Sequence, residues 1–460
     1  MVQGKRVCAE CVVEPYLAGV ITASGDVQEC DYCGNELPTM SIGEVAERFD
    51  VVIDNFFEVT SLSDAVVIYG REPTGDAIAD VVEMQLNAAM GVAEDVLEAL
   101  ADMWSDRSSM ESKYDDDPYF SEKSHLGGAY SVEWRAMVES LRSEARLFNP
   151  KTSAVLERVF GSILNDRTRK GSGVIVDAGP GGPRTTLFRA RVFQSLEALE
   201  RALHHPAREI GSPPPGVGRA GRMNAKGISV FYGATTADTA VAEVRPPVGS
   251  HVVVGQFTIS RPLRLLDLNA LADVVPSSGL SYFNPSTKDI VARHDFLRSL
   301  CNQLVMPVMP EFEDDGYLIT QLVADFLATH AELALDGILF ESVQHRGASP
   351  EPGRNVVLFN KASRTEGASS HAVDRVAYVN LYETDDDGDH WWPQITFRDA
   401  ADWKEPPYWQ TDPDERKPAL ILDTRSMIIQ EMKGVSYTST TSKVYTNVAP
   451  KEADLRKVKY

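Results

Sequence analysis

Apolar residues in the first third of the chain recur at helical spacing. In the segment 76–104 they occupy positions 78, 81, 82, 84, 92, 96, 97, 100 and 104, and the same spacing returns in 134–145. A repeat near 3.6 residues is typical of helices that bury one face, so both segments are predicted to be helical. Asn149 ends this part of the chain, because the residue before a proline is kept out of helical geometry. One more helix is expected over 153–164.

The middle of the chain has the pattern of strands. A segment rich in glycine and proline, 171–184, precedes residues 185–193, where positions alternate between two faces. The alternation places Arg189 and Arg191 on the same face of a predicted strand. Two such arginines are either surface charges or a fork for a pyrophosphate, whose oxygens guanidinium groups bind in pairs. A second short strand is expected over 228–232.

A helix with an unusual acid is predicted after the second strand. Thr235, with Asp238 three residues later, can cap this helix. Glu243 lies beside its apolar side, near the C-terminal end. The helix dipole disfavours a carboxylate at that end, so the position indicates a specific task for Glu243. Together with the helical first third, this mixed segment indicates an α+β fold.

The negative charge of the chain is concentrated at its N-terminal end. The 460 residues carry 45 basic and 67 acidic side chains, which gives a net charge of −22. Residues 1–150 hold 29 acids and 10 bases, whereas residues 151–460 hold 38 acids and 35 bases. An acidic surface repels phosphate backbones, so direct nucleic-acid binding is not expected.

The length of the chain is that of roughly two to four domains. It contains no run of about 18 apolar residues that would span a membrane. Lys5 and Arg6 are followed almost at once by Cys8 and Glu10, which is not the apolar core of a signal peptide. A cytoplasmic protein without membrane association is therefore expected.

Four of the five cysteines lie within the first 33 residues. Cys8 and Cys11 form one Cys-x-x-Cys pair, and Cys30 and Cys33 form another, with 18 residues between the pairs. This spacing is typical of Zn²⁺ bound by four thiolates, and Gly34 suits the tight turn after the second pair. Because four thiolates fill the coordination sphere, the predicted zinc is structural. The alternatives are reduced thiols or, in an exported protein, two disulfides.

Several motifs in the second half of the chain resemble the RES domain, a family named for an arginine, a glutamate and a serine. They are Phe188-Arg-Ala-Arg191, the segments 222–232 and 239–245, the block Leu335-Asp-Gly-Ile-Leu-Phe-Glu-Ser342 and the block Gly353-Arg-Asn-Val-Val-Leu-Phe-Asn360. The motifs occur in the order of the family, and the resemblance covers about residues 180–362.

This resemblance implies a toxin that destroys NAD⁺, on a fold like that of ADP-ribosyltransferases. RES domains cleave the nicotinamide–ribose bond by hydrolysis or phosphorolysis, which arrests growth, and they are typically paired with a DNA-binding antitoxin protein. The positions that match the family are Arg189, Tyr232, Glu243 and Ser342, with Arg191 as a second candidate arginine and Asn355 as a supporting residue.

The chemistry of such a cleavage needs these residue types. The ribose develops oxocarbenium character, which a carboxylate such as Glu243 can stabilise. Arg189 is expected to hold the pyrophosphate, and Tyr232 offers an aromatic wall and a hydroxyl. Ser342 is expected to bind the ribose or the carboxamide. No Gly-x-Gly-x-x-Gly follows a predicted strand, so a dehydrogenase is not indicated.

Four segments are expected: a zinc-binding module at 1–40, an acidic helical domain at 41–150, the RES domain at 151–362 and a β-rich extension of unknown role at 363–460. Residues 41–150 resemble the HEPN-type helical segments that precede many RES domains. The ribonucleases among those have an arginine four to six residues before a histidine. No arginine precedes His125, the one histidine of this segment, at that distance. The segment is therefore interpreted as a scaffold, a sensor or a self-control module.

Two alternative functions use the same chain differently. An ADP-ribosyltransferase would pass ADP-ribose to a macromolecule, and an inert RES portion would leave a zinc-binding, helical interaction protein. The sequence does not separate hydrolysis from phosphorolysis, because water and phosphate are both small nucleophiles. It also leaves open whether the chain forms a homo-oligomer.

Overall fold

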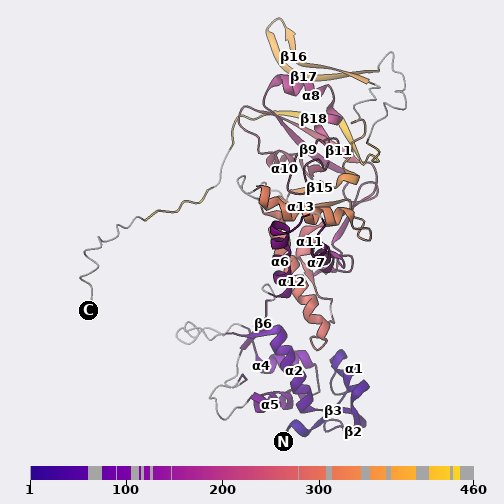
Figure 1. Ribbon diagram of the computed structural model, residues 1–460, viewed down its shortest axis with the longest axis vertical. Helices are drawn as coiled ribbons and strands as arrows, with labels where there is room; N and C mark the ends of the chain where they lie inside the picture. The colour runs from indigo at the N-terminus through magenta and orange to yellow at the C-terminus, as the bar shows by residue number, and fades with distance from the viewer. Residues whose placement is uncertain are drawn as a thin grey trace, which may run out of the picture.

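The computed structural model describes residues 2–60, 75–89, 91–104, 113–114, 119–124, 128–146, 148–277, 279–306, 313–342, 353–368, 375–399, 414–435 and 439–445. The N-terminal elements, a helical layer and a large sheet follow one another along the longest axis (Figure 1). His125, which bears on the comparison with HEPN-type segments, lies outside the described residues. In the part of the chain that is described, no helix has both the length and the apolar composition to cross a membrane.

The N-terminal elements form a small unit with its own core. In order they are β1 (Arg6–Cys8), α1 (Pro15–Ser24), β2 (Asp26–Glu29), β3 (Glu36–Ser41), α2 (Ile42–Phe56), β4 (Phe57–Val59), β5 (Asp76–Ala77), α4 (Ile78–Leu86), α5 (Val92–Trp104) and β6 (Tyr119–Glu122). Strands β1, β3 and β2 form one antiparallel sheet, and β4, β6 and β5 form another. Ser41 and Glu44 form a capping box that starts α2.

The predicted helical segment 76–104 is two helices rather than one. Asn87 ends α4 with a left-handed backbone (φ 43°), a conformation that asparagine tolerates better than most residues. Met84 and Trp104, two members of the predicted apolar face, are 62% and 43% exposed. Met84 lies two residues from the buried Val82 and Leu86 and is therefore on a different face of α4, so the apolar residues of 76–104 do not form one continuous buried face.

The helical layer consists of α6 (Ala129–Ser143), α7 (Pro150–Phe160), α11 (Leu268–Ala272), α12 (Pro285–Val305) and α13 (Glu313–Thr329). The prediction of a helix in 134–145 is confirmed by α6. The next helix begins earlier than predicted, because Pro150 occupies its first turn and the Asn149 side chain caps it by accepting from Thr152 N. Trp134 packs on Phe296 of α12, with ring centroids 5.4 Å apart. Both residues belong to one hydrophobic core that the helical layer shares with the large sheet.

The large sheet has eight strands. They are β8 (Ile175–Ala178), β9 (Thr186–Phe193), β10 (Phe231–Ala234), β11 (His251–Ile259), β12 (Leu263–Asp267), β14 (Gly337–Glu341), β15 (Arg354–Leu358) and β18 (Leu420–Glu431), arranged in the order β18-β11-β9-β10-β15-β14-β12-β8. Only the β12–β14 pairing is parallel among these neighbours. The mixed sheet and its helices confirm the α+β class.

The strand predicted over 185–193 is confirmed by β9. The next strand begins at Phe231, three residues later than predicted, and Thr236 rather than Thr235 caps α10 (Ala237–Glu243). Thr235 instead continues the pairing of β10 with β15, because its N–H donates to the Arg354 carbonyl at 2.9 Å and its Oγ1 accepts from Arg354 N at 3.1 Å. Pairing with a distant strand therefore moved the cap by one residue.

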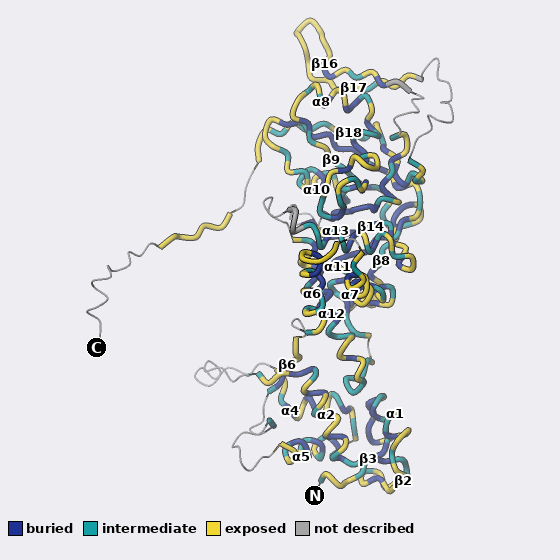
Figure 2. The backbone as a smooth tube through the Cα atoms, viewed as in Figure 1, coloured by how far each residue is buried: buried dark blue, intermediate teal, exposed yellow. Residues whose placement is uncertain are grey.

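The segment after residue 362 contributes to the large sheet and adds a separate hairpin. Strand β18 pairs with β11 over most of its length, although it follows the rest of the sheet in sequence. Strands β16 (Arg375–Asp385) and β17 (Gly388–Asp399) form the hairpin. The base of the hairpin lies on α8 (Leu196–Leu203), and the ring of His204, which follows α8, contacts the Ala377 carbonyl. The far half of the hairpin is exposed on both faces (Figure 2).

The N-terminal unit contacts the rest of the molecule through the first part of α12 and the segment before it. Tyr282 stacks on Phe56 with ring centroids 4.3 Å apart, and Lys288 Nζ donates to Asn55 Oδ1 at 2.7 Å. This contact joins α2 to the helical layer.

Candidate functional site

A cavity of about 360 Å³ lies among the central strands of the large sheet, α10 and α13. Its lining residues are Arg189, Ala190, Arg222, Met223, Tyr232, Gly233, Ala240, Glu243, Val244, Arg245, Tyr317, Phe340, Asn355, Val356 and Val357. The cavity therefore brings together β9, β10, α10 and β15, and its lining includes four of the six predicted NAD⁺-site residues, Arg189, Tyr232, Glu243 and Asn355. The other two, Ser342 and Arg191, lie next to it and are described below.

The carboxylate of Glu243 is held by two residues from neighbouring strands. Ser342 Oγ donates to Glu243 Oε1 at 2.6 Å, and Asn355 Nδ2 donates to the same oxygen at 2.8 Å. Ser342 and Asn355 are each 6% exposed, whereas Glu243 is an exposed residue. Both bonds fall on Oε1 and orient the carboxylate, and no residue that the structure describes donates to Oε2.

Arg189 enters the cavity from the middle of β9. Its Nη1 donates to the Tyr232 carbonyl at 3.0 Å, and the guanidinium lies 5.3 Å from the centre of the Phe231 ring. Burial, together with the charge of the nearby Arg191, lowers the pKa of Arg189 to about 10, which leaves the side chain cationic at neutral pH. The site thus holds a fixed cation and a fixed anion.

The hydroxyl of Tyr232 is used inside the protein. It donates to Asn224 Oδ1 at 2.9 Å and accepts from Met223 N at 2.9 Å, and burial raises the pKa of Tyr232 to about 12. A Cβ at Gly221 would lie 2.8 Å from this hydroxyl, so the close approach of the loop requires glycine there. Tyr232 thereby fastens the loop before β10 to the cavity wall.

Arg191 lies in a neighbouring groove rather than in the cavity. The groove has a volume of about 760 Å³ and shares Arg189 and Tyr232 with the cavity. Arg191 Nη1 donates to Glu209 Oε2 at 2.9 Å and also to the Glu209 carbonyl. Arg191 is therefore paired with Glu209, whereas Arg189 bonds to the Tyr232 carbonyl.

Arg222, Phe340 and Tyr317 are among the cavity residues that were not predicted from the sequence. Arg222 and Phe340 lie inside the RES-like motifs, and this position is a sequence feature by which they could be identified as candidate site residues. Tyr317 belongs to α13, which carries none of the motifs, and only the packing of α13 beside the sheet brings it to the cavity. No local pattern marks such a residue.

The four N-terminal cysteines form a second candidate site. Their sulfur atoms all lie within 4.8 Å of one another, and Cys8, Cys11 and Cys30 are buried. Gly34 has a left-handed backbone (φ 73°), and its N–H donates to the Cys30 carbonyl at 2.8 Å, as in a tight knuckle. Four soft ligands at this spacing fit a tetrahedral metal ion, which supports the expected structural zinc.

Purified protein is expected to contain about one zinc ion per chain. Cys30→Ser should lower the metal content and destabilise the N-terminal unit, because one of four ligands is lost and metal binding stabilises the fold. Cys301→Ala removes the one cysteine outside the cluster and should leave the metal content unchanged. Elemental analysis checks both variants, and freshly reduced wild-type protein without metal would contradict the assignment.

Comparison with known proteins identifies the family of the domain that contains the large sheet. Residues 186–380 match the family model described as the RES domain, so the chain contains a RES domain. The match covers all six predicted site residues: five lie on β9, β10, α10 and β15, and Ser342 directly follows β14. No curated protein and no solved structure matches the chain.

Proposed function

We propose that this protein is an enzyme that cleaves the nicotinamide–ribose bond of NAD⁺ and so depletes the dinucleotide. The observation that carries the proposal is the carboxylate of Glu243, which Ser342 and Asn355 hold in place at the cavity that Arg189 lines. The RES domain supports an enzyme that acts on NAD⁺ in general. The site supports the particular bond, because a fixed carboxylate is what an oxocarbenium-like transition state requires.

Two buried polar atoms support a polar ligand with both acceptors and donors. Among the described residues, the Arg189 Nε donor and the Asn355 Oδ1 acceptor have no hydrogen-bond partner. A buried group left without a partner costs about 1–3 kcal/mol, so a ligand that satisfies both atoms is favoured. NAD⁺ offers phosphate oxygens to Arg189 and hydroxyl or carboxamide donors to Asn355.

The arrangement of the two hollows suits a dinucleotide. Cavity and groove share Arg189 and Tyr232, so Arg189 lies at their boundary. A pyrophosphate joins two nucleosides, and a cation at the boundary can bind it while each hollow takes one nucleoside. In this arrangement the nicotinamide riboside occupies the cavity with Glu243, and the adenosine occupies the groove.

Cleavage breaks the bond between ribose C1′ and the nicotinamide nitrogen. The bonding electrons leave with nicotinamide, which becomes neutral, and positive charge develops on the ribose. Glu243 stabilises that charge by accepting from a ribose hydroxyl through Oε2, while Ser342 and Asn355 keep the carboxylate in position. Attack by water gives ADP-ribose and releases a proton, and attack by phosphate gives ADP-ribose 1″-phosphate.

Incubation of the purified protein with NAD⁺, with and without phosphate, tests this proposal. We expect loss of NAD⁺ and equimolar release of nicotinamide, and mass spectrometry of the second product separates hydrolysis from phosphorolysis. ADP-ribose attached to an added macromolecule would instead support an ADP-ribosyltransferase. Intact NAD⁺ would overturn the proposal and favour an interaction protein with an inert RES domain.

Expression of the wild-type chain is expected to deplete cellular NAD⁺ and to arrest growth. Co-expression with a DNA-binding antitoxin and deletion of the N-terminal unit test whether either one restrains this activity.

A further inference from the structure

The loop of residues 213–229 forms part of both the cavity and the groove. Arg222 and Met223 line the cavity, and Arg219 and Asn224 line the groove. Asn224 also accepts from the Tyr232 hydroxyl, as described above. The conformation of this loop therefore determines the shape of the proposed NAD⁺ site.

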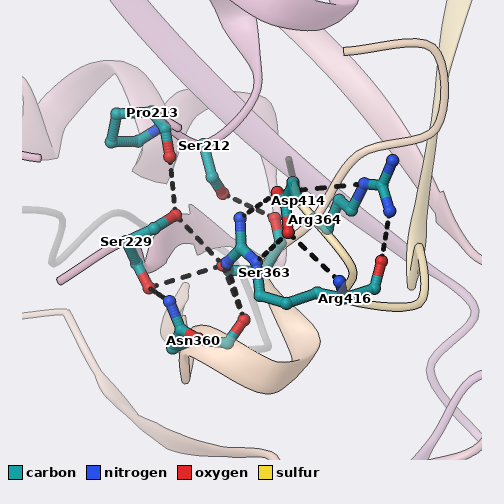
Figure 3. Close-up of polar contacts among 8 residues, drawn as sticks. All are labelled: Ser212, Pro213, Ser229, Asn360, Ser363, Arg364, Asp414 and Arg416. Atoms are coloured by element: carbon teal, nitrogen blue, oxygen red, sulfur yellow. Dashed lines mark hydrogen bonds and ion pairs between the residues drawn. The ribbon is translucent and has the colours of Figure 1, made fainter. Parts of the chain in front are cut away.

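The two ends of the loop are joined by buried serine side chains. Ser229 Oγ donates to the Pro213 carbonyl at 2.6 Å, which closes the neck of the loop. Ser363 Oγ lies 3.3 Å from Ser229 Oγ, and Ser212 Oγ donates to the Ser363 carbonyl at 2.7 Å (Figure 3). Ser229 and Ser363 are fully buried, so no water can replace these bonds at low cost.

Arg416, from the segment that leads into β18, binds this serine cluster from outside the loop. Its Nη1 donates to Ser363 Oγ and to the Asn360 carbonyl, each at 2.8 Å (Figure 3). Its Nε and Nη2 donate to Asp414 at 2.7 and 2.6 Å, and these bonds hold the pKa of Asp414 below its usual range. The paired carboxylate fixes the guanidinium in the orientation that reaches Ser363.

The chain of bonds from Arg416 through Ser363 and Ser229 to Pro213 leads us to a role for the C-terminal segment. We propose that residues 414–420 complete the NAD⁺ site and that Arg416 is a positioning residue, which orders the loop 213–229 without touching the ligand. The loop contains four glycines, at positions 216, 218, 221 and 227, so its ordering has a high entropic cost that this network offsets. Arg416 does not line the cavity or the groove, so its effect passes through Ser363.

Two variants of the full chain and one control test this proposal. Arg416→Ala removes the guanidinium, and Ser229→Ala removes one hydroxyl with little change in volume. Arg425→Ala, at an exposed position of the adjoining strand β18, is the control for loss of a positive charge. For each variant we measure kcat and KM for NAD⁺, hydrogen exchange of the loop amides and the thermal midpoint.

For both test variants we expect KM to rise about tenfold, with kcat changed by less than about threefold, because the loop shapes binding and does not hold Glu243. The amides of Gly216, Gly221 and Gly227, which bond within the loop, should exchange about tenfold faster, while amides of β9 and β11 should be unchanged. The control should match the wild type in each measurement. A variant whose thermal midpoint falls while KM and loop exchange stay at wild-type values would overturn the proposal.

The kinetic part of this test rests on the proposed function, and the hydrogen-exchange part does not. If the wild type leaves NAD⁺ intact, the proposed function fails, and loop exchange still decides whether Arg416 positions the loop. If the wild type cleaves NAD⁺ and the variants keep both their KM and their slow exchange, only the inference about Arg416 fails.

Discussion

Replacing Glu243 with glutamine should lower the turnover of NAD⁺ by about 10²-fold or more and leave NAD⁺ binding largely intact. Glutamine keeps an oxygen that can accept from Ser342 and Asn355, so the local geometry is preserved. The negative charge is lost, and that charge is needed where positive charge develops in the transition state. Single-turnover kinetics and calorimetric titration with NAD⁺ measure the two effects separately.

Glu341→Gln is the matched control for this experiment. Glu341 is an exposed carboxylate one residue before Ser342, and it is not part of the cavity lining. The control should turn over NAD⁺ like the wild type and should still arrest growth, whereas the Glu243 variant should not. Wild-type turnover by Glu243→Gln would show that the carboxylate is not the catalytic group and that the proposed site is assigned incorrectly.

Replacing Arg189 with alanine should weaken NAD⁺ binding by about tenfold to 10²-fold, because a charge-assisted bond to the pyrophosphate is lost. The pyrophosphate is unchanged between substrate and transition state, so the effect should appear mainly in KM. Arg191→Ala tests the alternative arginine. Its partner is Glu209, outside the cavity, so the effect on KM should be smaller.

The ranking of the two arginines is the decisive result. Titration of each variant with NAD⁺ at constant ionic strength gives the dissociation constants directly. If Arg191→Ala weakened binding more than Arg189→Ala, the dinucleotide would lie along the groove and not across its boundary with the cavity.

The sequence contained enough local information to predict several parts of the site. Alternation in 185–193 predicted β9, and the Cys-x-x-Cys spacing predicted a cluster whose sulfur atoms lie within 4.8 Å. The position of Glu243 at the end of a helix was also predicted and is confirmed. The strand and helix positions depend on neighbours within a few residues, where backbone geometry determines which side chains share a face. Each Cys-x-x-Cys pair is likewise local, and the metal-ligand spacing indicated that the two pairs come together.

The difference between the surroundings of Arg189 and those of Arg191 could be seen only in the tertiary structure. Strand alternation places both on one face, so the pattern makes them equivalent. In the fold, Arg189 lies against Tyr232 of β10, whereas Arg191 lies against Glu209 of α9 (Pro206–Ile210). Elements separated in sequence by about 20 to 40 residues thus give two similar side chains different environments.

The sequence by itself determined most of the local elements, the cysteine cluster and the motifs that indicate the RES domain. Only the tertiary structure decided that Tyr317 of α13 lines the cavity, that β18 is an edge strand of the large sheet, and that Arg416 bonds to Ser363. Tyr317 and Arg416 lie 85 and 184 residues along the chain from Tyr232 of the cavity. The physical reason is that such contacts arise from the packing of whole elements on a shared core, and no periodicity within either segment specifies its distant partner.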